Sequence, residues 1–364
     1  MKIALLNLPF DNNYGGNLQR YALIKVLQGM GHEVEHINLH CSYSLPWYKY
    51  PYSIPKRIIK KYLLGKKDEV VFLEKKLEED MKQRLSLASR FYEKYIPHTD
   101  VCTNIKQIIE KTSGKFDAYL VGSDQVWRKG STRQIGLKNY LLDFTKEMYV
   151  KRIAYAVSFG VSGNLLKQKE ITSLKQNYAR FDAVSVREKS ALELLNDYGW
   201  NSPTPSLCLD PTLLLSANDY FEIIDENDTD DLTSGKIFSY ILDETEKTKF
   251  ISNFYKKHFE KEIVKVGLND TADVSICQWL NNIRCADLVI TDSYHGCVFS
   301  IIFNRPFVFL GNKGRGNSRI ESLFEMLGIK SDDTLKIDYV YVNNKIKELM
   351  SISKCFLSSI ASLK

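Results

Sequence analysis

Residues 2–39 read KIALLNLPFDNNYGGNLQRYALIKVLQGMGHEVEHINL and contain the clearest indication of the fold class. Ile3–Leu8 is a compact apolar run, typical of a buried strand, and Leu18–Leu27 places apolar side chains mostly at helical spacing. Two glycines close the helical stretch, and Val34–Leu39 resumes as a strand. The pattern predicts one βαβ unit, which opens an α/β domain.

The same alternation returns further along the chain. Strand-like apolar runs occur in AYLVGSD, RIAYAVSFG, DAVSVRE and LCLDPTLLL, between residues 118 and 215. They return in KIFSYIL, IVKVGL, ADLVITD and PFVFLG, between residues 236 and 311, mostly with helical stretches between them. Parallel sheets produce such sequences because strands buried on both faces are apolar throughout.

The alternation of strands and helices is interrupted twice, once by an insertion within the first domain and once by a linker between the domains. Residues 41–115 carry an aromatic, proline-bearing stretch and a long charged helical region, and residues 223–236 are acidic and poor in apolar side chains, as linkers are. We therefore predict an α/β domain over 1–222 with a helical insertion at about 41–115 and a linker at 223–236. A second α/β domain over 237–343 and a C-terminal helix over 344–364 follow.

Length and composition narrow the class of protein. With 364 residues, the chain exceeds the size at which one core usually stops growing, so two domains are expected. The net charge of +6 is no nucleic-acid signature, and nucleic acid is not an expected partner, although phosphorylated substrates or an anionic membrane surface would fit. Seven scattered cysteines without a CxxC pair indicate reduced thiols in a cytosolic chain.

The apolar runs of the sequence are too short to suggest a secretory signal or a transmembrane helix. The opening MKIALLNLPF has an apolar run that is too short for a secretory signal, and we expect a first strand there. No apolar run approaches the roughly 18 residues that a transmembrane helix needs. The expected localisation is cytoplasmic.

The first candidate binding motif is Asn13-Tyr14-Gly15-Gly16-Asn17, which follows the first strand. Open sheets bind ligands at the carboxyl ends of their strands, and two facing domains would build one cleft from both sets of ends. Glycines let a backbone approach a ligand, and a helix N-terminus offers free N–H groups to an anion or hydroxyl. The motif is not a dinucleotide or P-loop fingerprint, and a tight turn that needs glycine explains it equally well.

Two further motifs follow strands of the first domain. Ser123, Asp124 and Gln125, in GSDQVW, form a cluster of small and polar side chains that can bind a hydroxyl or phosphate, or cap the next helix. Arg187, in SVRE, lies where a strand passes into a helix and can hold a carboxylate or phosphate with two parallel hydrogen bonds. A surface pair between Arg187 and Glu188 is the alternative, but the position favours a ligand.

The most informative motif is TDSYHG, residues 291–296, between the strand LVI and the helical run CVFSIIF. Among six histidines, His295 alone lies in a strand-to-helix turn. The helix dipole would lower its pKa and a bound anion would raise it again, so it can bind a ligand and deliver a proton near neutral pH. A histidine that caps the helix or lines the core is the structural alternative. The candidate binding residues beside it are Asp292, Ser293, Tyr294 and Gly296.

A weaker signal is GRGNSR, residues 314–319, ahead of the helical IESLFEMLG. Arg315, Asn317, Ser318 and Arg319 form a second anion-friendly helix start, although a mobile basic loop would give the same pattern. The pair of acids around Thr229 has DxD form but lies in the polar linker. No HExxH, GxSxG or paired-cysteine pattern occurs, so we predict no metal site.

The ordered set of motifs resembles the polysaccharide pyruvyl transferase family: NYGGNLQRYAL, GSDQVW, SFG, SVRE, LDPTLLL and TDSYHG followed by FSIIFNRPFV. The matches run from about residue 11 to residue 328. The resemblance implies a GT-B-like pair of Rossmann-like domains with the active site in the cleft between them. It also implies transfer of pyruvate from phosphoenolpyruvate to sugar hydroxyls, usually as a cyclic ketal, with no cofactor besides this co-substrate.

The resemblance also assigns roles by position. His295 matches the family histidine proposed as general acid, and Arg187 matches the arginine that holds phosphoenolpyruvate. Many members have RLHG at this place, whereas serine and tyrosine precede the histidine here. A second donor-binding arginine is therefore missing locally, and we expect Arg315 or Arg319 to replace it.

The basic run PKRIIKKYLLGKK, residues 55–67, holds six Lys and Arg before the first acid, Asp68. Apolar side chains on one helical face complete the pattern of a helix that lies on an anionic membrane, although a solvated helix packed on the domain would look the same. Family members often act on lipid-linked saccharides. We therefore expect a surface-polysaccharide precursor as acceptor and a peripheral contact with the inner face of the cell membrane.

Two other functions remain open from the sequence. A GT-B glycosyltransferase that uses a nucleotide sugar would use the same cleft and the same histidine. The other is a non-catalytic protein of this fold that binds an anion or glycan. Its best support is that serine and tyrosine precede the histidine here, where many family members have RLHG.

Overall fold

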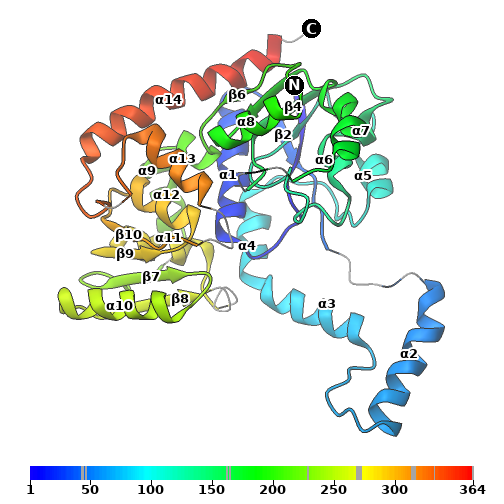
Figure 1. The fold of residues 1–364 in the computed structure, drawn as a ribbon, viewed down its shortest axis with the longest axis horizontal. Helices are drawn as coiled ribbons and strands as arrows, with labels where there is room; N and C mark the ends of the chain where they lie inside the picture. The colour runs from blue at the N-terminus through cyan, green and yellow to red at the C-terminus, as the bar shows by residue number, and fades with distance from the viewer. Residues whose placement is uncertain are drawn as a thin grey trace.

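The structure, a computed structural model, describes residues 1–41, 45, 47–160, 163, 165–227, 229–267, 273–312, 317–331 and 333–362. Its strands form two sheets, one in each half of the molecule (Figure 1). The first sheet has six strands in the order β2-β1-β3-β4-β5-β6, and the second has four in the order β10-β9-β7-β8. Every neighbouring pair in both sheets is parallel. The predicted fold class, a GT-B-like pair of Rossmann-like α/β domains, is confirmed.

The first domain opens with the predicted βαβ unit, in which β1 and β2 pair from Lys2 opposite Glu33. Four of the five residues of β1 are buried, as expected for a strand covered on both faces. The strands of this domain are β1 (Lys2–Leu6), β2 (Glu33–His36), β3 (Ala118–Val121), β4 (Lys151–Val157), β5 (Ala183–Val186) and β6 (Ser206–Leu207). Its helices are α1 (Tyr14–Gly29), α5 (Ile105–Thr112), α6 (Leu137–Tyr140), α7 (Gln168–Tyr178) and α8 (Lys189–Asp197), with a 3-10 turn η3 (Asp143–Thr145).

The second domain repeats the alternation on a smaller sheet. Its strands are β7 (Ile237–Ile241), β8 (Ile263–Gly267), β9 (Leu288–Thr291) and β10 (Phe307–Phe309). Its helices are α10 (Glu246–His258), α11 (Ile276–Cys285), α12 (Tyr294–Ile302) and α13 (Ser318–Leu327). The turn η4 (Pro211–Leu214) and helix α9 (Ala217–Asp225) lead from the first sheet toward it, so the segment expected as a linker begins inside α9.

The last helix returns from the second domain to the first. Helix α14 (Tyr339–Ser359) begins before the expected residue 344, because the Asp338 side chain caps it by accepting from the Tyr341 N–H at 3.0 Å. Near its end, the Ser353 hydroxyl accepts from the Leu209 N–H at 2.9 Å, and a final turn, η6 (Ile360–Ser362), follows. The two domains are therefore joined twice along the chain.

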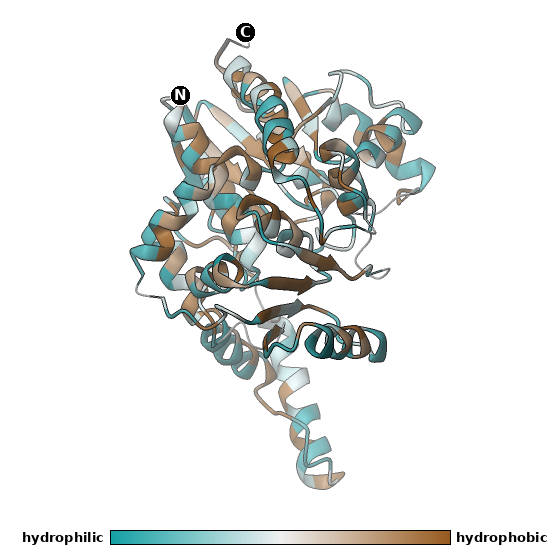
Figure 2. Cartoon of the chain, turned by 90° about the vertical axis from the view of Figure 1, so that its left-hand side faces the viewer, coloured by the Kyte–Doolittle hydropathy of each residue, from teal (hydrophilic) through white to brown (hydrophobic). Residues whose placement is uncertain are grey.

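An arm, residues 47–84, extends away from the rest of the molecule in both views (Figures 1 and 2). It consists of the turn η1 (Trp47–Lys49), helix α2 (Tyr50–Ile58), a π-helical turn η2 (Ile59–Leu63) and helix α3 (Leu73–Arg84). Helix α4 (Ser86–Tyr95) follows and joins the arm to the core, where Phe91 and Tyr92 are buried. No helix among the described residues is long and apolar enough to cross a bilayer.

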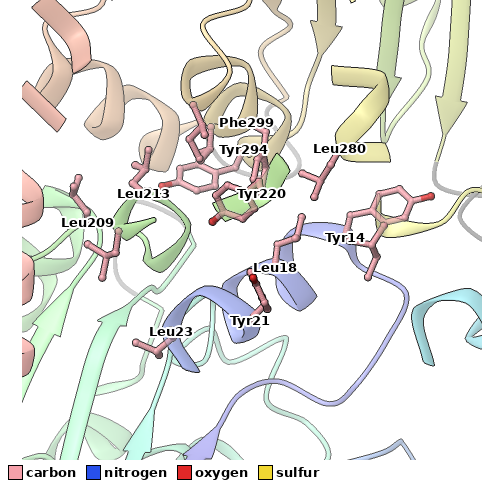
Figure 3. Packing of buried hydrophobic residues seen from close by; sticks show 14 of the residues in the cluster. Tyr14, Leu18, Tyr21, Leu23, Leu209, Leu213, Tyr220, Leu280, Tyr294 and Phe299 are labelled. Carbon is pink, nitrogen blue, oxygen red and sulfur yellow. The ribbon is translucent and has the colours of Figure 1, made fainter. Parts of the chain in front are cut away.

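Helix α1 lies between the two domains and is buried on most of its surface. Figure 3 shows Tyr14, Leu18 and Tyr21 of α1 among residues of both halves of the molecule. The Tyr14 ring stacks on Trp279 at 5.2 Å between centroids, and its hydroxyl donates to the Val274 carbonyl at 2.7 Å. This packing fixes the start of α1 against the second domain, where the candidate site lies.

Candidate active site

A cavity of about 250 Å³ lies between the two domains, next to the starts of α1 and α12. The first domain contributes the segment 11–13 after β1 together with Asp124, Gln125 and Arg128 after β3. The second domain contributes residues 292–295 after β9 and polar side chains on both sides of the start of α13. The wall is thus built from segments that follow parallel strands, where open α/β sheets bind ligands.

His295 enters the cavity wall from the first turn of α12. The Ser293 hydroxyl caps this helix by accepting from the Gly296 N–H at 3.4 Å, and the Thr291 hydroxyl accepts from the Ser293 N–H at 3.0 Å. A Cβ atom on Gly296 would lie 2.3 Å from the Thr291 Oγ1, so only glycine lets the helix start this close to β9. The TDSYHG motif therefore fixes the position of the histidine.

Gly15 of the first motif packs directly against the histidine of the other domain. A Cβ atom on Gly15 would lie 1.9 Å from Nδ1 of His295, so the missing side chain of Gly15 makes room for the imidazole. At Gly16 the nearest atom to such a Cβ would be the Asn13 side chain at 3.5 Å, an ordinary contact. The start of α1 and the start of α12 are thus fitted to each other across the cleft.

His295 is 7% exposed, and its protonation depends on charges of both domains. Burial lowers the pKa of His295 to about 4, although the carboxylates of Asp210 and Asp124 raise it. Its Nε2 lies 3.8 Å from Oδ2 of Asp210. The imidazole is therefore neutral at neutral pH, and an anion bound beside it would favour its protonated form.

Arg187, expected to hold an anionic donor, does not line the cavity. It is 1% exposed and donates to Oδ2 of Asp210 at 2.5 Å and to Oδ1 of Asp124 at 3.0 Å. The Tyr294 ring lies over its guanidinium at 4.5 Å from the ring centroid. Burial would lower the pKa of Arg187, but the phenol and carboxylates around it raise the pKa overall. The side chain is therefore a fixed internal cation behind the cavity wall.

Asp210 belongs to the LDPT segment, which marked the family resemblance but was not predicted to act in the site. It is buried and accepts from Gln19 Nε2 at 2.5 Å and from the Thr212 hydroxyl at 2.7 Å, in addition to Arg187. Burial would raise the pKa of Asp210, but Arg187 and His295 lower it overall. Gln19 comes from α1, so this helix supports the carboxylate nearest His295.

Two other arginines line the cavity. Arg319, at the start of α13, lies with its Nη1 3.6 Å from Oδ1 of Asp124 and with its guanidinium 5.6 Å from the centroid of the Tyr294 ring. Arg128, which the sequence analysis missed, donates to the Gln125 Oε1 at 2.6 Å. No carboxylate in the described part of the chain forms an ion pair with Arg128, which leaves its charge available to a ligand.

A family model described as polysaccharide pyruvyl transferase matches residues 13–314. The chain belongs to the polysaccharide pyruvyl transferase family. The resemblance found in the ordered motifs is thereby confirmed. No curated protein matches the sequence.

Several solved structures are similar to this pyruvyl transferase family member over nearly their whole length. UDP-N-acetylglucosamine 2-epimerase from Rickettsia bellii has 12% identity and a TM-score of 0.44, with 100% of each chain covered. Anabaena HepE in complex with UDP has 10% identity and a TM-score of 0.47, also with 100% of each chain covered. The S. aureus MnaA–UDP structure has 12% identity and a TM-score of 0.47, with 98% of this chain and 91% of that chain covered.

In this family member the cavity wall includes most of the predicted binding residues. Those that line it are Asn13, Asp124, Gln125, Asp292, Ser293, Tyr294, Asn317 and Arg319. Six others do not line it: Gly15, Gly16, Asn17, Ser123, Gly296 and Ser318. Asn17 instead donates to the Asp11 carbonyl at 3.0 Å, and the Ser123 hydroxyl donates to the Ala156 carbonyl at 2.8 Å. Arg315 lies outside the described residues.

The rest of the wall in this transferase is rich in carboxylate and carboxamide groups. Asp292 accepts from the Leu242 N–H at 2.7 Å and from Nδ2 of Asn312 at 2.8 Å. Asp11 and Asn12, which precede α1, line the wall beside the predicted Asn13. Among the described residues there is no group of three or more His, Cys, Asp or Glu that could hold a metal ion. Side chains of this kind are suited to neutral, hydroxyl-bearing ligands.

Proposed function

We propose that this protein transfers the pyruvyl group of phosphoenolpyruvate to two hydroxyls of a saccharide and closes a cyclic ketal. One observation carries the proposal: the imidazole of His295 shares a cavity of about 250 Å³ with the guanidinium groups of Arg128 and Arg319. The family match over residues 13–314 gives the class of reaction. The cavity contains an acid–base group and two cations, as a reaction on an anionic enol donor requires.

Arg128 and Arg319 are our candidates for the donor site. Phosphoenolpyruvate carries a carboxylate and a phosphate, and arginine binds both groups with paired hydrogen bonds. In this proposal Arg319, one of the two arginines considered from the sequence, takes the place of the arginine that is absent before His295. Arg187 is a positioning residue in this scheme, because it compensates Asp124 and Asp210 and supports the Tyr294 ring.

His295 is the proposed general acid. Binding of the donor anion would offset the burial that keeps the imidazole neutral, so His295 takes up a proton as the donor binds. It then delivers this proton to the methylene carbon, and a sugar hydroxyl attacks the cationic C2 that results. Phosphate leaves, and a second hydroxyl closes the ketal. One hydroxyl proton restores the imidazolium and the other departs with the phosphate, so the protons balance.

The acceptor is proposed to bind along the carboxylate and carboxamide part of the wall. Asp11, Asn13 and Asn317 offer oxygen atoms and amide groups at the cavity surface, and Asp292 is held in place by two backbone N–H groups and an amide. Such groups orient sugar hydroxyls by accepting and donating hydrogen bonds. A lipid-linked precursor of a surface polysaccharide is the acceptor that we propose.

The test is incubation of the full chain with phosphoenolpyruvate and a panel of synthetic and lipid-linked galactosides. Phosphate release and the mass of the sugar are followed together, with His295→Gln as the inactive control. We expect both signals to rise in parallel. Neither phosphate release nor a mass gain with any acceptor, together with thermal stabilisation by a nucleotide sugar and not by phosphoenolpyruvate, would overturn the proposal.

Arginine variants test the donor site separately. We expect Arg128→Ala and Arg319→Ala to raise the KM for phosphoenolpyruvate about 10- to 100-fold each, because a hydrogen bond to a charged group contributes about 1.5–3 kcal/mol. Arg133→Ala, an exposed arginine outside the cavity, is the matched control and should leave KM unchanged. Unchanged donor affinity in both cavity variants would remove the assignment.

A further inference from the structure

The arm exposes large apolar side chains on an element that no other described part of the chain covers. Trp47 is 83% exposed and Leu63 is 76% exposed, and Tyr52, Tyr62, Leu64 and Phe72 are exposed as well. Hydrophobic and hydrophilic residues alternate along the arm (Figure 2). Soluble proteins rarely display so many apolar side chains together unless another surface covers them.

The first part of the arm, residues 47–67, is also strongly basic. Between Trp47 and Lys67 there are seven Lys and Arg residues and no Asp or Glu. Lys56, Lys66 and Lys67 are exposed, and none of them forms an ion pair with a described carboxylate. Their charges are therefore free to meet an anionic partner.

A groove of about 710 Å³ lies between two segments of the arm, residues 58–62 and residues 70–80. Ile58, Tyr62, Val71 and Phe72 form apolar walls, and the polar part of the lining consists of Lys61, Lys75, Lys76, Glu79 and Asp80. The apolar walls match the apolar chain of a lipid, and the exposed Lys56, Lys66 and Lys67 supply the cations for its anionic headgroup.

The arm is a preformed element that the body of the protein holds in place. The Arg57 guanidinium donates to both carboxylate oxygens of Glu74, at 2.6 Å and 2.7 Å, and so joins α2 to α3. Helix α4 continues from α3 into the core, where Phe91 contacts the ring of Tyr21 on α1. The exposed surface is therefore presented at a defined end of the molecule (Figure 1).

We propose that the arm docks this protein on an anionic lipid bilayer. Its leucines and isoleucines would enter the boundary between headgroups and acyl chains, its tryptophan and tyrosines suit the headgroup level, and its lysines would contact anionic headgroups. A second copy of the chain is a poorer occupant, because each arm carries eleven Lys and Arg against six Asp and Glu over residues 47–84, so two arms repel each other. Docking stands apart from pyruvyl transfer, although it would hold the cleft near lipid-linked saccharides.

The experiment measures co-sedimentation of the full chain with vesicles of phosphatidylcholine, with and without phosphatidylglycerol. We expect binding only to the anionic vesicles. Raising the salt from about 0.1 M to about 1 M shortens the Debye length from about 10 Å to about 3 Å and should release the protein. The triple variant Lys56→Glu, Lys66→Glu, Lys67→Glu should lose affinity about 100-fold or more, since each Lys near an anionic surface contributes about 1 kcal/mol.

Two further variants separate charge from apolar contact. Leu63→Ser with Leu64→Ser should lower affinity at least about 10-fold, because both side chains would leave the lipid boundary. The charge-matched control Lys106→Glu, Lys115→Glu, Lys169→Glu changes exposed lysines of the body and should bind like the wild type. Circular dichroism confirms that each variant is folded, and turnover on a soluble galactoside should be unchanged in all three.

Three results would overturn the proposal. One is equal binding to vesicles with and without phosphatidylglycerol, and another is equal loss in the arm variant and its control. The third is light scattering that shows a dimer that the Leu63→Ser, Leu64→Ser variant dissociates, which would make the arm a contact between copies. Vesicle binding without any pyruvyl transfer would leave docking intact and count against the proposed function alone.

Discussion

The interdomain site and the arm differ in how their charged side chains are buried and paired. In the site, Arg187 is almost fully buried and contacts Asp124 and Asp210, because a buried charge without a partner is very costly. In the arm, Lys56 and Lys66 are exposed, and neither forms an ion pair with a described carboxylate. A single change in the site should therefore have a large effect, whereas the exposed lysines of the arm should matter only when several are changed together.

The largest expected effect is on turnover in His295→Gln. A positioned acid contributes about 10²- to 10⁴-fold to rate, and we expect kcat for phosphate release to fall by that factor. Binding of phosphoenolpyruvate, measured by calorimetry, should be nearly unchanged, and so should binding to anionic vesicles. Retained turnover would show that another group supplies the proton.

Removal of a buried charge should cost stability where removal of an exposed one does not. Asp210→Asn leaves the buried Arg187 with less compensation, and we expect the free energy of unfolding in urea to fall by about 3 kcal/mol. Glu69→Gln is the control in the arm, where Lys60 and Glu69 lie 3.6 Å apart and partly exposed, and should cost less than about 1 kcal/mol. Equal losses would mean that the site tolerates an uncompensated arginine.

Gly15→Ala tests the fit between the two domains. The new Cβ would lie 1.9 Å from Nδ1 of His295, so the imidazole or the start of α1 must move. A displacement of about 1 Å in a reacting group costs about 100-fold in rate, and we expect a loss of this size in kcat. Gly16→Ala is the matched control, because its Cβ would meet the Asn13 side chain at an ordinary 3.5 Å. A fully active Gly15→Ala enzyme would contradict the observed contact.

Most of the fold could be predicted from the sequence, because the patterns that indicate strands and helices involve neighbouring residues. The apolar runs of β1, β3 and β9 are buried strands, and His295 lies at the start of a helix directly after one of them. The ordered motifs also identified the family. Strand periodicity and strand-to-helix turns can be recognised from neighbouring residues, so a sheet edge with a histidine on it was predictable.

The sequence did not show which arginine faces the cavity. Arg187 is buried because Asp124 and Asp210, 63 and 23 residues away in the chain, accept its hydrogen bonds. No local pattern encodes such a pairing. Arg128 follows the GSDQVW motif without any feature that marks it, and its importance comes only from the cavity that it lines.

The exposure of the arm could not be predicted from the sequence either. Its basic and apolar composition was evident in residues 55–67, but a helix packed on the body would have had the same composition. Whether such a helix finds a partner within the fold depends on tertiary packing, which helical spacing alone does not determine. The structure leaves Tyr62 and Leu63 exposed, and this exposure is what the vesicle experiment uses.

The smallest expected effect is on the pH dependence of stability. Burial lowers the pKa of His295 to about 4, whereas a histidine in the unfolded chain titrates near 6.5. Between these values the unfolded state binds more protons, so the free energy of unfolding falls as the pH falls. From pH 7 to pH 5 the contribution of His295 to this fall is about 2 kcal/mol.

His295→Gln should remove this part of the acid sensitivity, because glutamine does not titrate. Burial also lowers the pKa of His36 well below its usual value, so the wild type and the variant share that contribution, and their difference in urea unfolding at each pH isolates His295. The arm variant Lys56→Glu, Lys66→Glu, Lys67→Glu alters no group that contacts the site and should follow the wild-type curve. If His295→Gln also follows it, the imidazole is not held neutral in the folded protein, and proton uptake on donor binding loses its basis.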